Sequence, residues 1–209
     1  MKNILSQNEV DELLSDFQIA TENTEHLREQ KLMKEDIKRL QKVHESLKNG
    51  LSDKLSTLFR NSVEITLLQI KKHSASAMKK VDESSSVSSC FIFGNEIGRY
   101  TSNITLVYSM IERLLGGSGI SSYHSQYLTE IEKRIYSQVL DVVLECIRLQ
   151  WKQNNLSSVI IGKACAEDKD VELKSDVIII TMQITLNPGM QGQIQLYYPL
   201  DSLLEILLV

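Results

Sequence analysis

The chain has 209 residues, of which 42% are hydrophobic and 24% are charged, and it carries a formal net charge of −4. This composition is typical of a globular protein, and the length is enough for one domain with its own hydrophobic core and an additional segment. Because Lys and Arg form no basic stripe that could neutralise phosphates, we expect no nucleic acid among the partners.

The first predicted element is an amphipathic helix near the N-terminus. Ser6 and Glu9 form a capping box at its start, and Leu5 before the cap can pack on Val10. Apolar residues recur at helical spacing and form one face: Val10, Leu13, Leu14 and Phe17. A helix of about 11 residues is unstable alone in water, so this face must pack on its own domain or on another protein.

A polar and charged segment, residues 18–36, predicts a linker that leads to a domain over residues 37–209. Apolar residues at helical spacing predict a first helix over residues 37–59, despite Gly50 in its interior. A strand is expected over residues 63–70, and two more over 90–93 and the weaker, polar run 99–102. A helix from about residue 106 then ends at a run of glycines.

The same order of elements is expected a second time. Thr129 and Glu132 form another capping box, at the start of a long helix that runs to Trp151. Strands follow over residues 159–166, 177–186 and 191–196, and a last short helix over 200–208. Such a repeated order predicts an α/β domain in which two halves share a central sheet and helices cover its faces.

The glycine loop, defined here as Gly116, Gly117, Ser118 and Gly119, has two interpretations. One is structural, since glycine at positive φ ends a helix at little cost. The other is that so many glycines leave a bare backbone loop that presses against a partner. The sequence alone favours neither interpretation over the other.

Several other functions find no support in the sequence. The cysteines Cys90, Cys146 and Cys165 lie far apart in apolar runs, which favours buried thiols in the reducing cytoplasm. No apolar stretch approaches the roughly 20 residues of a membrane-spanning helix, so any membrane association is expected to be peripheral. The histidines have no partners at metal-ligand spacing, and the common hydrolase and nucleotide-binding motifs are absent; we expect no metal, cofactor or catalytic residue.

Several segments together resemble the FliM family of flagellar motor switch proteins. Residues 4–14 are similar to that family's N-terminal peptide, and residues 114–119 to its G-G-x-G loop. Residues 43–47, 128–132 and 198–204 resemble three further stretches of its middle domain, in the same order. The resemblance covers nearly the whole chain, and the combination is far more specific than any single motif.

The resemblance implies a CheC-like, three-layer α/β fold with an internal pseudo-twofold repeat over residues 37–209, after a docking helix over 1–17 and a linker over 18–36. It implies that the docking helix binds the phosphorylated response regulator CheY through one group of residues: Ile4, Leu5, Ser6, Gln7, Glu9, Val10, Asp11, Leu13 and Leu14. It also implies that the glycine loop binds the rotor protein FliG. The chain would then be a non-enzymatic adaptor in the ring of the flagellar basal body, beside similar subunits at the cytoplasmic face of the inner membrane.

Two features qualify what the resemblance implies. The same fold serves phosphatases of CheY, whose E-x-x-N pairs orient a water molecule, but no E-x-x-N occurs in this sequence: Lys48 follows Glu45 at that spacing, and Ile135 follows Glu132. A CheC-like phosphatase is therefore the weaker alternative. The family normally continues into a domain similar to FliN, whereas this sequence ends at Val209, so the resemblance gives no support for FliN as a partner.

Overall fold

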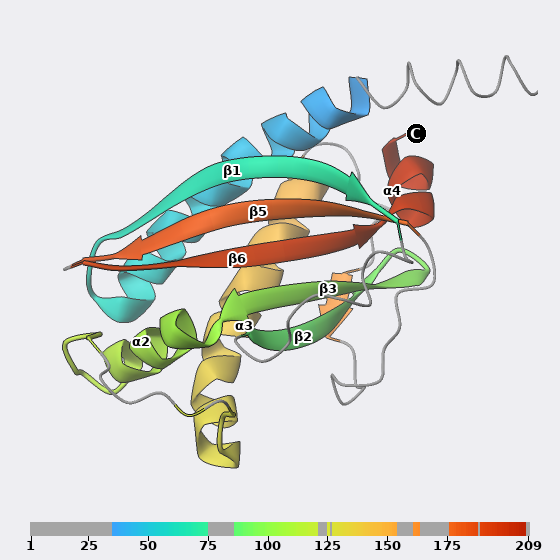
Figure 1. Cartoon of the computed structure of the whole chain (residues 1–209). Helices are drawn as coiled ribbons and strands as arrows, with labels where there is room; N and C mark the ends of the chain where they lie inside the picture. Colours follow the sequence, from blue (N-terminus) through green and yellow to red (C-terminus); the bar gives the residue numbers. More distant parts are fainter. Residues whose placement is uncertain are drawn as a thin grey trace, which may run out of the picture. The chain divides into compact units, whose positions relative to one another are not determined.

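The computed structural model describes residues 35–74, 86–120, 125, 127–153, 161–163, 176–187 and 189–207. The chain divides into two compact units, Met1–Leu40 and Gln41–Val209, and the second unit contains the whole sheet (Figure 1). The predicted docking helix and nearly all of the predicted linker lie outside the described residues, so these expectations stay predictions.

The sheet of the second unit has six strands in the order β1-β5-β6-β3-β2-β4, and every paired strand is antiparallel to its neighbour. The strands have these bounds: β1 Val63–His73, β2 Ser86–Phe93, β3 Glu96–Asn103, β4 Ile161–Lys163, β5 Val177–Leu186 and β6 Met190–Pro199. Hairpins join β2 to β3 and β5 to β6.

The strand order confirms the internal repeat. Exchanging β1, β2 and β3 with β4, β5 and β6 gives the same order read from the other edge, with β3 and β6 paired at the centre. Each half also gives its first strand to the other half: β1 pairs with β5, and β4 pairs with β2. The predicted sharing of one sheet by two halves is thus an exchange of strands.

The helices follow the predicted order as well. The first helix covers residues 35–59, and the others are α2 Ile104–Leu114, α3 Glu130–Gln153 and α4 Leu200–Leu207. In the first helix a buried stripe recurs at helical spacing and is formed by Val43, Leu47, Leu51, Leu55 and Phe59. Among the described residues, none of the helices combines the length and apolar character needed to cross a membrane.

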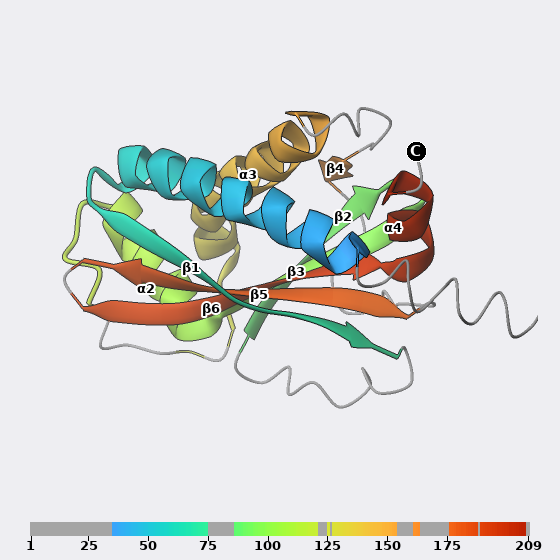
Figure 2. The same ribbon diagram turned by 90° about the horizontal axis from the view of Figure 1, so that it is seen from above.

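One face of the sheet carries the apolar core. Figure 2 shows residues 41–59 of the first helix and α3 on the same side of the sheet. Tyr198 of β6 lies on this face, with its ring centroid 5.5 Å from that of His44 in the first helix and 5.7 Å from that of Trp151 in α3. The Tyr198 hydroxyl also lies 3.2 Å from Nε2 of His44. Edge contacts of buried rings are favourable, so this cluster holds both helices on the sheet.

The opposite face of the same strands is mixed, with a buried apolar cluster of Val177, Ile179 and Tyr197 beside a group of polar side chains. Thr181 of β5 pairs with Gln195 of β6 in the register, and the Gln195 amide nitrogen lies 3.5 Å from the Thr181 hydroxyl. The Tyr197 hydroxyl donates to Oε1 of Gln195 at 2.6 Å, and the Thr101 hydroxyl of β3 to the same oxygen at 3.4 Å. These uncharged groups satisfy one another across three strands, which lets them lie in the sheet at little cost.

The α/β class and the central sheet with its helices are confirmed, and most predicted elements lie within a few residues of their observed bounds. The described part of the strand predicted over residues 159–166 is β4, which has three residues. The polar run predicted as a weak strand is β3, which occupies the centre of the sheet and extends over eight residues.

We predict that Gly98→Ala destabilises the domain. An ideal Cβ at this position of β3 would lie 2.6 Å from the Phe91 ring and 2.9 Å from the carbonyl oxygen of Tyr197. Because that oxygen belongs to the backbone of the neighbouring strand, we expect the free energy of unfolding to fall by about 1–3 kcal/mol, measured by chemical denaturation.

Gly50→Ala is the matched control. It lies inside the first helix, and the nearest atom to an added Cβ is Nε2 of Gln150 at 3.6 Å, an ordinary contact distance. Since Ala favours the helix, this variant should gain about 0.5–1 kcal/mol. Equal losses in both variants would contradict the steric explanation.

Candidate functional site

The glycine loop begins as a helix cap at the end of α2. The amide of Gly117 donates to the carbonyl of Glu112 at 2.8 Å, and the amide of Gly116 to the carbonyl of Arg113 at 3.0 Å. Gly116 has a φ of 86°. These are the paired hydrogen bonds and the left-handed residue of a Schellman motif, so Gly116 has a structural role.

The other two glycines pack closely against side chains of α2, which would have to move to admit a Cβ. A Cβ at Gly117 would lie 2.6 Å from Cγ of Glu112, and one at Gly119 would lie 2.5 Å from Nε of Arg113. Gly119 also has a φ of 74°. The structural interpretation therefore accounts for every glycine of the loop, whereas binding of a partner by the loop is untested and stays a prediction.

The residues that flank the glycine loop are exposed and apolar. Leu115 is 70% exposed and Ile120 is 58% exposed, and Ser118 between them is exposed as well. The Ser118 hydroxyl contacts Oε1 of Glu112 at 3.4 Å and accepts the Ile120 amide at 3.3 Å. The result is a short, folded loop that presents two large apolar side chains to solvent, a surface suited to contact with another protein.

Arg113 connects this loop to a second turn, a connection that no sequence pattern indicates. Its Nη1 donates to the Gly117 carbonyl at 3.5 Å, and its Nη2 donates to the carbonyl of Asn187 in the turn between β5 and β6. The side chain of Asn61 donates to the same Asn187 carbonyl at 2.8 Å. Asn61, Arg113 and Asn187 are distant in sequence and follow no local motif, so only the fold could bring them together.

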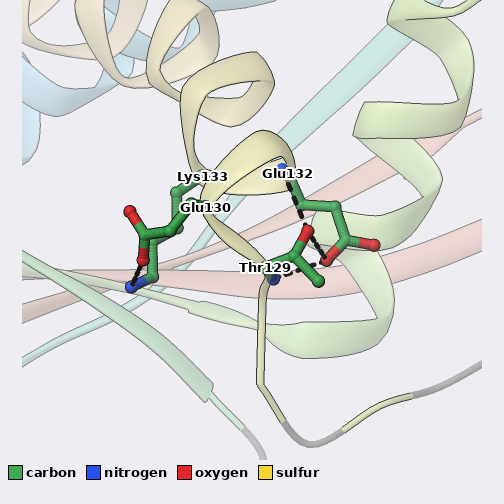
Figure 3. A network of polar contacts seen from close by, with 4 residues as sticks. All are labelled: Thr129, Glu130, Glu132 and Lys133. Carbon is green, nitrogen blue, oxygen red and sulfur yellow. Dashed lines mark hydrogen bonds and ion pairs between the residues drawn. The ribbon is translucent and has the colours of Figure 1, made fainter.

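The start of α3 carries a complete capping box, as predicted (Figure 3). The Thr129 hydroxyl and amide contact Oε2 of Glu132 at 2.8 and 2.6 Å, and the Glu132 amide donates back to the hydroxyl at 3.3 Å. In the same turn Lys133 donates to Glu130 at 2.7 Å, and this hydrogen bond lowers the pKa of the exposed Glu130 carboxyl. Tyr127 and Ile131 nearby are both exposed, at 70% and 73%.

Glu45 and Glu132, the residues compared above with the E-x-x-N pairs of the phosphatases, make structural contacts on their own helices. Glu45 forms an ion pair with Lys48 on the first helix, and Glu132 closes the capping box of α3. Within the described ranges, no group of His, Cys, Asp and Glu could hold a metal ion. The geometry gives the phosphatase alternative no support.

Comparison with known proteins decides the family. A family model described as flagellar motor switch protein FliM matches residues 33–209. The chain belongs to the FliM family. The FliM of Bacillus subtilis (strain 168) is 24% identical over 166 residues, which cover 71% of this chain and 50% of that protein. The chain therefore spans half the length of this curated FliM relative.

Solved structures share the fold of this FliM-family chain. In the crystal structure of the FliG-FliM complex from H. pylori, the matching chain is 20% identical, with a TM-score of 0.73 over 82% of this chain and 98% of that chain. Thermotoga maritima FliY is 13% identical, with a TM-score of 0.69 over 82% and 93%. Identities this low establish the fold, and the residue-level sites need their own tests.

Gly116→Ala should destabilise the domain through backbone strain alone. An added Cβ meets nothing within 4 Å, so the variant creates no clash. A left-handed conformation costs most L-residues about 1–2 kcal/mol, and we expect that loss of unfolding free energy in a denaturation experiment. Gly116→Asn should lose less, because Asn tolerates this conformation. Equal stability of the Ala variant and the parent would contradict the cap assignment.

Proposed function

We propose that the chain is the switch-controlling part of a flagellar motor protein, which binds FliG through the glycine loop and phosphorylated CheY through its N-terminal helix. It acts as an adaptor without catalysis, in the basal body at the cytoplasmic face of the inner membrane, beside neighbouring copies in a ring. Family membership supports this assignment, together with the H. pylori FliM that was crystallised with FliG.

The observation that carries the FliG contact is the folded glycine loop with its exposed apolar flanks. Leu115 and Ile120 are the large side chains that a partner could bury there, and burial of such anchors supplies most of the energy of a protein interface. Gly117 is a poor probe of the contact, because any side chain there must displace Glu112. Substitutions of the flanking residues remove a contact with the partner without distorting the loop.

We expect Leu115→Asp and Ile120→Asp to weaken FliG binding by about tenfold or more each, since loss of one interface anchor costs about 1–2 kcal/mol or more. Isothermal titration with FliG measures the effect. Leu68→Asp is the matched control, because Leu68 is a 45% exposed apolar residue of β1, outside the glycine loop. Unchanged affinity in both loop variants would refute the assignment of the FliG site.

The second part of the proposal concerns CheY. The N-terminal helix captures phosphorylated CheY, and the linker keeps it at a high local concentration beside the domain. If bound CheY favours one arrangement of neighbouring subunits and of FliG, the rotation sense changes by a shift of population between two states. The sequence of residues 4–14, which predicts a capped helix with one apolar face, supports this role.

Leu13→Ala combined with Leu14→Ala should abolish binding of phosphorylated CheY without lowering the melting temperature of the domain. Both residues lie on the predicted apolar face, which we expect to supply most of the affinity. Glu12→Ala, which changes a residue off that face, is the control. A titration in which the double variant binds as the parent does would rule out this helix as the docking element.

A further inference from the structure

We propose that Arg113 is the positioning residue of the FliG site, because it ties the glycine loop to the turn between β5 and β6. This inference rests on the proposed binding of FliG by the loop. The role differs from direct contact: Arg113 would act on FliG by fixing the positions of Leu115 and Ile120, while its own side chain faces the fold.

The loop side of this connection consists of one hydrogen bond and close packing. Nη1 of Arg113 donates to the Gly117 carbonyl at 3.5 Å. The Cα of Gly119 packs so closely on the Arg113 side chain that an added Cβ would lie 2.5 Å from Nε and 3.0 Å from Cγ. Nε of Arg113 is buried and has no hydrogen-bond partner among the described residues, whereas the hydrogen bond from Nη2 to Asn187 is exposed. The side chain therefore runs beneath the loop and reaches the surface only at its end.

The turn side is anchored from two directions. Nη2 of Arg113 donates to the Asn187 carbonyl, and Nδ2 of Asn61 donates to the same oxygen at 2.8 Å. The Asn187 amide in turn donates to the carbonyl of Ser62 at 3.4 Å. The accepting carbonyl is therefore held in place by the segment that precedes β1. Arg113, hydrogen-bonded to this carbonyl and to that of Gly117, fixes the loop relative to the same segment.

The chemistry of the guanidinium suits this task. Its planar fork presents several N–H donors in a fixed geometry, so one group reaches two carbonyls that face it from different loops. A lysine carries the same charge on a flexible stem with a single terminal nitrogen, and it cannot span both carbonyls in the same way. We therefore expect Arg113→Lys to fail as a replacement.

The test compares FliG affinity and loop dynamics in Arg113→Gln, Arg113→Lys and the parent chain. Both variants should bind FliG about tenfold more weakly, the ratio that corresponds to the loss of one charge-assisted hydrogen bond. Amide hydrogen exchange of residues 116–120 without FliG should be faster in both variants, while exchange in β5 and β6 is unchanged. Arg148→Gln is the matched control, since Arg148 forms an exposed ion pair with Glu145 on α3, away from the loop.

Asn61→Ala separates positioning from direct contact. If Arg113 acts through the Asn187 carbonyl, Asn61→Ala also weakens FliG binding. The double variant, Asn61→Ala with Arg113→Gln, then loses less affinity than the product of the two single fold-losses. Losses that multiply independently would mean that Arg113 touches FliG directly, and they overturn the proposal.

The experiments also distinguish failure of the positioning role of Arg113 from failure of the proposed FliG site. Parent-like affinity in Arg113→Gln or Arg113→Lys, or unchanged exchange of the loop amides, overturns the positioning role while Leu115→Asp still weakens binding. If Leu115→Asp and Ile120→Asp leave FliG affinity unchanged, the binding site itself is misassigned; the exchange experiment then still decides whether Arg113 fixes the loop.

Discussion

The exchange of first strands between the two halves is the constraint on which the rest of the structure depends. β1 extends the hairpin of β5 and β6, β4 extends that of β2 and β3, and β3 pairs with β6 between them. Because each half completes its sheet with a strand from the other, neither half has a closed fold of its own, and cooperative unfolding of the domain follows. The register that sets Val63 opposite Leu186 also brings residues 60–62 beside the turn at Asn187.

Local patterns predicted the elements well, because each helix and most strands carry a strong apolar period. The first helix and α3 were recognisable from their buried stripes, and the Thr129 capping box predicted the start of α3 to within one residue. β3 is the instructive exception, since its polar residues lie in the centre of the sheet. The Thr101 hydroxyl finds its partner in Gln195 of β6, and such a contact across strands leaves no trace in the local sequence.

The candidate site was predictable only in part, for a related reason. The glycine loop is conspicuous in the sequence, but its glycines fit two explanations, and only the folded structure shows the conformational or packing reason for each. The exposure of Leu115 and Ile120 depends on how α2 lies on the sheet. The link from Arg113 to Asn187 joins residues 74 positions apart, which periodicity and motifs do not detect. The resemblance to the FliM family suggested the proposed partners, which no physical pattern in the residues could name.

The close packing of the glycine loop affects both the entropy cost of binding a partner and the stiffness of the resulting contact. The backbone of Gly117 and Gly119 rests on the side chains of α2 before any partner arrives. Ordering a flexible segment is one of the main entropic penalties of association, and a preformed loop avoids most of it. If a partner binds this loop, as proposed, the connection is short and stiff, and a small rotation of the domain is passed to the bound protein almost undiminished.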